Sequence, residues 1–399
     1  MFRHRAPVSV AALAVSTALA STLAFAPGVH AAPPENTDST PAGAYSKASR
    51  DTGTKPARQA KNARAGFVLV NDLRRMAPGA TPLALRSPAA NDLWIAARGR
   101  DGALMMIRKL GNRWTAHRTS VSLAADAAVT IDGLDAKEVW ATAAGSLLRF
   151  DGRRWADIGA RGVTYTTVAD APGRGAYAGT RKAISESSHE SRVIWTDGRR
   201  TRDLGSVYPD MPGRATLARI RVSGSQVFAE WGGQKANGSA LDVWGHVRGT
   251  WVERYVNQWE QPRWAEQHAT SWLVTSRGSL LTLGRDMPRS NGQTSAIRGL
   301  CHQWTGTGKR VDCTTAGAVG AADVRSDGRV VIGGDDAAPT ATTPLTAGTF
   351  RMRDRTGTET VIPGDPGDAT LALTVEPRTH VAWALTRTGS TTTLQTYRG

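Results

Sequence analysis

The stretch that decides the fold is Ala-Val-Thr-Ile-Asp-Gly-Leu-Asp-Ala-Lys-Glu-Val-Trp-Ala-Thr at residues 128–142, followed by Ser-Leu-Leu-Arg-Phe-Asp-Gly-Arg-Arg-Trp-Ala-Asp-Ile at 146–158. Short apolar runs in it are separated by Gly and Asp, the residues that turns require. A strand is expected before the first turn, a second at 139–141, a third at 147–150 and a fourth at Trp155, after the tight turn Asp151-Gly152. One unit is therefore a four-stranded antiparallel sheet.

The unit is repeated along the chain. Asn-Asp-Leu-Trp-Ile at 91–95 and Gly-Asn-Arg-Trp-Thr at 111–115 form the preceding copy, and five weaker copies follow. The residues taken as equivalent are Leu93, Val139, Ala176, Val227, Leu280, Val330 and Val381, at spacings of 46, 37, 51, 53, 50 and 51. Intervals of this size are typical of propeller blades. The sequence thus predicts an all-β, seven-bladed β-propeller, with six or eight blades as the less favoured alternatives.

The two ends of the repeat region complement each other. The last unit stops after the strand expected at 393–397 and lacks a fourth strand, whereas an extra strand, Gly-Phe-Val-Leu-Val at 66–70, precedes the first unit. Pairing of these two strands would close the ring and remove the sheet edges that an open array exposes. The repeated Trp residues are expected in the core, as large fillers between blades.

These repeats resemble a known group. Asp-Leu-Trp-Ile-Ala at 92–96 and Glu-Val-Trp-Ala-Thr at 138–142 are similar to the Asp-Val-Trp-Ala-Val-Gly repeat of secreted actinobacterial β-propeller proteins. The resemblance covers two units well and the others loosely. It implies a propeller and secretion, and it implies no particular activity.

The N-terminal part has a different composition. Arg3 and Arg5 precede an apolar run at 8–25, and small residues end at Ala31, so residues 1–31 are predicted to be a signal peptide. A membrane anchor is the less favoured reading, since the run is short, and no membrane span is expected after cleavage. Residues 32–64 are predicted to be a disordered linker and residues 65–399 the propeller. We expect a secreted, extracellular protein.

Charge and cysteine content fit that expectation. The formal net charge is +16, and removal of the signal peptide takes away two arginines and no acid, which leaves +14. Such a balance favours a polyanion, although the arginines are scattered as in a protein from a GC-rich genome. The expected partner is an anionic polysaccharide or cell-wall polymer, or an extracellular protein; nucleic acid is not expected, and the chain is expected to be a monomer. Cys301 and Cys313 are predicted to form a disulfide between the outer two strands of the fifth blade.

No catalytic motif stands out. The sequence lacks Gly-x-Ser-x-Gly, His-Glu-x-x-His and a phosphate-binding loop, and its histidines are spread over different units. No catalytic, cofactor-binding or metal-binding residue is therefore assigned. The acid pairs Asp132 with Asp135 and Asp335 with Asp336 are interpreted as solvated turn residues.

Long connections suggest where a ligand would bind. Those at 183–191, 232–239, 286–294, 335–347 and 256–270 are expected as loops on one face. Within 258–268, the candidate ligand-binding residues are Trp259, Arg263, Trp264 and His268, which could stack on a sugar or bind an anion. The competing interpretation is a loop held over the rim by its own aromatic residues.

The function expected from these features is non-catalytic binding through the loop-rich face. One alternative is a propeller-based extracellular polysaccharide or lactone lyase or hydrolase. The second alternative is a protein-interaction scaffold.

Overall fold

The structure is a computed structural model that describes residues 66–185, 189–206, 215–235, 238–257, 265–274, 279–290, 293–294, 298–304, 310–334, 349–364 and 367–399. The signal peptide and linker predicted for residues 1–64 lie outside these ranges. Within the described residues, no helix has the length and apolar character needed to cross a membrane.

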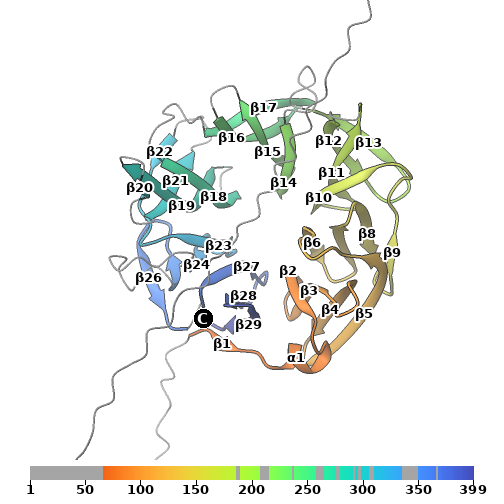
Figure 1. Cartoon of the computed structure of the whole chain (residues 1–399), viewed down its shortest axis with the longest axis horizontal. Coiled ribbons are helices and arrows are strands. Elements are labelled where there is room, and N and C mark those ends of the chain that lie inside the picture. Colours follow the sequence, from red (N-terminus) through yellow and green to blue (C-terminus); the bar gives the residue numbers. More distant parts are fainter. Residues whose placement is uncertain are drawn as a thin grey trace, which may run out of the picture. The chain divides into compact units, whose positions relative to one another are not determined.

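The described residues between Gly66 and Gly399 fold into seven antiparallel sheets arranged around a ring (Figure 1). The innermost strand of each sheet contacts the innermost strand of the next, and the chain runs outward within each blade. From the inside outward, the strands of blades 1 to 3 are β2 (Thr81–Ala89), β3 (Asp92–Arg98), β4 (Ala103–Leu110) and β5 (Arg113–Ser122); β6 (Val129–Asp135), β7 (Glu138–Ala143), β8 (Ser146–Phe150) and β9 (Trp155–Asp157); and β10 (Thr164–Asp170), β11 (Ala176–Ala183), β12 (His189–Thr196) and β13 (Thr201–Gly205).

Blades 4 to 7 follow the same plan. Their strands are β14 (Ala215–Ser223), β15 (Gln226–Lys235), β16 (Gly238–Val247) and β17 (Thr250–Asn257); β18 (Ala265–Val274), β19 (Leu280–Ser290), β21 (Arg298–Trp304) and β22 (Arg310–Asp312), with β20 (Gln293–Thr294) on β19; β23 (Val319–Val324), β24 (Val330–Gly334), β25 (Phe350–Arg353) and β26 (Glu359–Ile362); and β27 (Ala369–Val375), β28 (Ala382–Thr388), β29 (Thr391–Tyr397) and β1 (Val68–Leu69). The predicted seven-bladed, all-β propeller is confirmed. One short helix, α1 (Asp72–Met76), precedes blade 1.

The predicted closure is also confirmed. β1 is the outermost strand of blade 7, where Val68 pairs with Thr396 and Leu69 with Gln395. Beside it, the ring of Phe67 lies 3.7 Å from that of Phe350 in blade 6. The first and last parts of the propeller are therefore joined in one sheet, and the ring has no open end.

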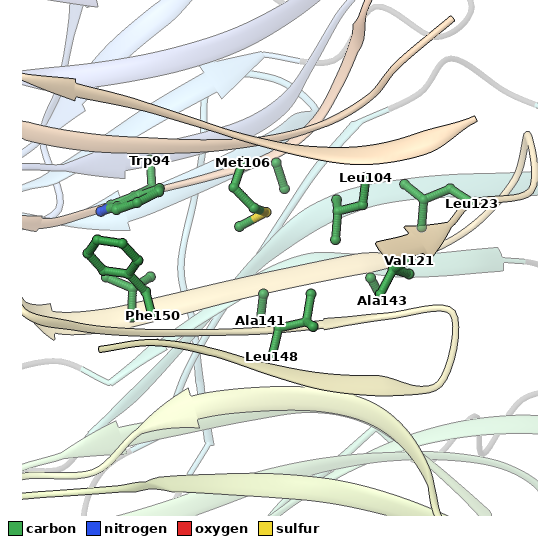
Figure 2. Close-up of a cluster of buried hydrophobic side chains, with 11 residues drawn as sticks. Trp94, Leu104, Met106, Val121, Leu123, Ala141, Ala143, Leu148 and Phe150 are labelled. Atoms are coloured by element: carbon green, nitrogen blue, oxygen red, sulfur yellow. The ribbon is translucent and has the colours of Figure 1, made fainter. Parts of the chain in front are cut away.

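The hydrophobic core lies between the blades. The buried apolar side chains of the described residues form seven clusters, one at each interface between neighbouring blades. Figure 2 shows the cluster between blades 1 and 2, where Trp94, Leu104 and Met106 pack on Ala141 and Leu148. Because side chains alternate along each strand, every blade supplies one face to each neighbour.

The repeated Trp belongs to a recurrent arrangement. Trp94 is fully buried, and Arg108, its cross-strand partner, places its guanidinium carbon 5.0 Å from the Trp94 ring and makes two 2.8 Å hydrogen bonds to Asp92. In blade 2, Arg149 lies 5.3 Å from the ring of buried Trp140 and 3.2 Å from Glu138. The acid two residues before each Trp therefore holds the Arg that covers its ring.

Three of the expected long loops are instead extended hairpins. β11 and β12 pair out to Ala183 and His189, β15 and β16 out to Lys235 and Gly238, and β19 pairs with β20 out to Ser290 and Gln293. The prediction of loops at 183–191, 232–239 and 286–294 is thus wrong, because residues between the apolar strand cores continue the ladder of backbone hydrogen bonds. The segment 335–347 lies outside the described residues.

The disulfide prediction is confirmed. Cys301 in β21 is bonded to Cys313, which directly follows β22, with 5.0 Å between the Cα atoms. The bond links the third and fourth strands of blade 5, as the spacing predicted.

Candidate functional site

The innermost strands of all seven blades line a central cavity of about 550 Å³. Its lining includes Leu134 and Ser223, at the ends of β6 and β14, and the turn residues Ser326 and Pro377, which follow β23 and β27; all four lie at the end of the channel where the turns are short. The cavity therefore lies toward the short-turn end, opposite the hairpins that were expected to form the binding face. Its volume is within the usual range for small-ligand sites.

A layer of charged residues crosses this cavity. Each charged residue lies on an inner strand, opposite the second-strand position that the repeated Trp occupies. The cross-strand pairs are Arg86 with Trp94, Asp132 with Trp140, Arg221 with Phe228 and Asp323 with Val331. They belong to blades 1, 2, 4 and 6, so equivalent positions of the repeat place four charges at one level of the channel. Two of them are cations and two are carboxylates.

Arg86 joins the two carboxylates. Its Nε lies 2.7 Å from Oδ1 of Asp132, and its Nη1 lies 3.9 Å from Oδ2 of Asp323. Burial opposes the charge on Arg86, but Asp132, Asp323 and Asp170 outweigh it and hold the pKa of this guanidinium above its usual range. The interpretation of Asp132 as a solvated turn acid is therefore wrong: ring closure brings it against a cation that is 46 residues away in the sequence.

Asp170, the last residue of β10, adds a third carboxyl group. It is 4% exposed; its Oδ2 accepts a hydrogen bond from the Leu134 backbone at 2.6 Å, and its own N–H donates to Oδ2 of Asp132 at 3.0 Å. Burial, together with the charges of Asp132 and Glu138, raises the pKa of Asp170 to about 7, against the hydrogen bonds from the Leu134 and Ala171 backbones, which lower it. One carboxyl in the channel is thus partly protonated near neutral pH.

Arg221 is the second cation of the layer, and it differs from Arg86 in its contacts. Among the described residues it has no ion pair or hydrogen bond, its Nε is buried, and its guanidinium carbon lies 5.7 Å from the ring of Trp272. Burial and the like charges of Arg219 and Arg86 lower the pKa of Arg221 below its usual range, and the charges of Asp323 and Asp132 offset this only in part. Arg219, two residues earlier, has a carboxylate partner in Glu230 at 3.5 Å. A guanidinium forms strong, often bidentate hydrogen bonds with carboxylate and phosphate groups, so Arg221 has the chemistry to bind an anion.

Polar side chains of the inner strands also connect neighbouring blades. Oδ2 of Asp323 accepts from the Val375 backbone at 2.9 Å, and the hydroxyl oxygens of Thr130 and Ser271 accept from Val168 and Ala322 in the same way. Asp132 and Asp323 therefore stabilise the ring as well as line the cavity. Arg221 makes no such bond, which separates it from the structural polar groups.

The mouth of the cavity carries a Ser–His pair. Oγ of Ser326 lies 2.8 Å from Nε2 of His380, and both residues belong to the short turns of blades 6 and 7. Next to them, Arg325 lies 3.1 Å from Asp327. No group of three or more His, Cys, Asp or Glu side chains in the described part of the chain is placed to hold a metal ion.

None of the four residues predicted from sequence to bind the ligand has a described side chain. Trp259, Arg263 and Trp264 lie outside the described residues, and His268 lies in the first part of β18, residues 265–270, where the structure describes only the backbone. The channel residues were missed because each looks like an isolated charge. A signal was nevertheless present: Arg86, Asp132 and Asp323 each stand seven residues before the second-strand position used to align the repeats.

Comparisons with known proteins support the fold. No protein-family model and no curated protein matches the sequence. Among solved structures, the polysaccharide lyase Uly1 has a TM-score of 0.52 at 9% identity, covering 81% of this chain and 90% of that one. An oligogalacturonate lyase in complex with manganese has a TM-score of 0.51 at 10% identity, covering 77% and 86%.

A puromycin-hydrolysing peptidase of Mycobacterium tuberculosis has a TM-score of 0.50 at 14% identity over 76% of this chain, which spans 50% of the peptidase. Identities this low show a shared fold, and fold does not determine activity. The class that the fold defines is the seven-bladed β-propeller.

Proposed function

We propose that this propeller is an exported binding protein that holds an anionic carbohydrate in its central channel. Arg221 is the observation that carries the proposal. Keeping a guanidinium half-buried without a carboxylate partner costs stability, and that cost is offset when a bound anion completes its hydrogen bonds. Other arginines in buried surroundings, such as Arg108 and Arg351, already have carboxylate partners.

The rest of the cavity suits a sugar. The carboxylates of Asp132 and Asp323 are acceptors for hydroxyl groups, and Asp170, with a pKa of about 7, can donate or accept. The net charge of +14 that remains after removal of the predicted signal peptide would attract a negatively charged polymer toward the channel. Of the two structures of similar fold, one is by name a polysaccharide lyase and the other an oligogalacturonate lyase, and the likeness is to their fold alone.

The test compares the mature chain with R221Q in binding to a short uronic-acid oligosaccharide, measured by calorimetry. Loss of the charged hydrogen bonds should raise the Kd about tenfold or more. R113Q, which removes the same charge from exposed β5, should leave the Kd within about twofold. Equal affinity of the wild type and R221Q would contradict the proposal, as would equal binding of a neutral oligosaccharide.

A second candidate function is cleavage of the same class of carbohydrate. The observation that favours it is the pair Asp132 and Asp170, two carboxyl groups in one cavity, with the pKa of Asp170 raised to about 7 as a proton donor requires. Binding mixtures can be assayed for new reducing ends and for the ultraviolet absorbance of an unsaturated uronate. Product that forms with the wild type and disappears with D170N would favour the enzyme; its absence would favour pure binding.

A further inference from the structure

The inner strands form a ring around the channel that Arg221 lines. Among the described residues, each inner strand contacts the inner strands of both neighbouring blades, and β1 completes blade 7 from outside, so the ring of strands is continuous. Figure 1 shows the inner strands β2, β6, β10, β14 and β18 surrounding the axis. A polymer can therefore enter the channel only through one of its ends, along the axis.

Arg221 lies below the mouth. It precedes Ser223, the last residue of β14, by two residues, which corresponds to roughly 7 Å along the strand. Its guanidinium stays at that depth, since it lies over Trp272, whose ring is 1% exposed between blades 4 and 5. An interior segment of a polymer lying across the mouth would have to bend sharply inward to reach it.

The charges of this layer determine which charge the end of a bound glycan should carry. The two arginines and two aspartates of the layer balance in charge, but Arg86 lies within ion-pair distance of both Asp132 and Asp323, whereas Arg221 has no carboxylate at that distance among the described residues and feels theirs only from farther away. A single negative charge fits this surrounding better than the nearly double charge of a phosphate monoester. Hydroxyl groups on the same residue would meet the carboxylate oxygens of the layer.

We propose that the channel recognises the free end of an acidic glycan, and that the terminal sugar places its carboxylate on Arg221. This inference rests on the proposed function and narrows it from an anionic carbohydrate to a chain end. Longer glycans would bind with the stoichiometry of their ends, whatever their number of sugar units.

The test uses one uronic-acid oligosaccharide in four forms: both ends free, a bulky group on the reducing end, the same group on the other end, and both ends blocked. Calorimetry gives the Kd of each form for the wild type and for R221Q. We expect at least one singly blocked form to bind like the free oligosaccharide. The doubly blocked form should bind about tenfold more weakly or worse.

The R221Q variant shows whether the bulky group weakens binding by keeping the sugar end away from Arg221 or by some other effect. In R221Q, all four forms should bind with the same weak affinity. The substitution removes the interaction between the terminal carboxylate and Arg221, so blocking the ends has no further interaction to remove. If the wild type binds the doubly blocked and the free forms with Kd values within about twofold of each other, the inference is overturned and the proposed function still stands. No binding of any form would overturn both.

Discussion

The pKa values of two aspartates in this chain are shifted in opposite directions because the surroundings of the two residues differ. Asp151, in an exposed turn, accepts hydrogen bonds from the backbones of Arg154 and Arg153, and these bonds lower its pKa. Asp170 lies in the channel, where burial and neighbouring carboxylates raise its pKa to about 7. The first residue was correctly interpreted as part of an Asp-Gly turn, and the second was not singled out by any local feature.

The raised pKa of Asp170 predicts a pH dependence of stability. The folded chain keeps a proton that the unfolded chain, with a pKa of 3.8, releases, so this contribution is fully present below 3.8 and is lost as the pH rises through about 7. Asn keeps the hydrogen bond from Leu134 and cannot ionise. The stability of D170N relative to wild type should therefore increase between these two pH values, by at most about 1.4 kcal/mol per pH unit.

Urea unfolding of both proteins across that interval measures the effect. D151N is the control, because the pKa of Asp151 is lowered: its carboxylate stabilises above 3.8, so D151N should lose stability there relative to wild type. A difference between D170N and wild type that stays constant with pH would show that Asp170 ionises normally.

At the scale of elements, two short outer strands are held in different ways. β9 has three residues, and Trp155 packs its ring 5.3 Å from that of Trp94 and 5.7 Å from that of Phe150. β22 also has three residues, and a disulfide fastens its end to β21. Three pairs of a ladder give little stability to an edge strand, so each blade adds a contact of its own.

Removal of the disulfide should destabilise blade 5. The bond closes a loop with a sequence separation of 12, for which the chain-entropy estimate is about 2–3 kcal/mol. C301A/C313A should unfold at correspondingly lower urea concentration than the oxidised wild type. Addition of reductant should shift the wild type toward the variant and leave the variant unchanged; no shift of the wild type would show that the bond contributes nothing.

At the scale of the whole molecule, the ring depends on a small joint. β1 has only two residues, yet Phe67 beside it is 6% exposed, stacks on Phe350 and Tyr397, and donates its N–H to the Pro363 carbonyl at 2.6 Å. The joint therefore fastens blade 7 to blade 6 as well as completing blade 7. Because every interface carries one core cluster, opening one exposes apolar surface on two blades.

F67A should reduce the free energy of unfolding by about 3–5 kcal/mol, the usual cost of removing a buried Phe ring. V68A is the matched control: Val68 is the next residue and is 62% exposed, so its effect should stay within about 0.5 kcal/mol. Thermal unfolding of the three proteins measures both. Equal melting temperatures for F67A and V68A would mean that the joint does not hold the ring.

Much of the architecture could be predicted because it depends on local patterns that recur. The spacing of Trp94 and Trp140 indicated blades, the unpaired strand at 66–70 indicated closure, and the positions of Cys301 and Cys313 indicated their pairing. The alignment of the seventh unit was wrong by one residue. Val139 faces the preceding blade, and in blade 7 the residue that does so is Ala382, which faces blade 6. Val381 and Trp383 face blade 1 instead, so Ala382 is the equivalent of Val139. A shift of one residue exchanges the faces of a strand, and weak repeats leave that choice open.

The sequence by itself therefore determined the blades, their number and the joint that closes them, since alternation, turns and repeat length are properties of neighbouring residues. Only the tertiary structure decided the site. Arg86, Asp132, Arg221 and Asp323 lie in four different blades, and nothing near any of them indicates which charges it will face. Closure of the ring sets those distances, and with them the ion pairs of Arg86 with Asp132 and Asp323 and, among the described residues, the lack of an ion pair for Arg221.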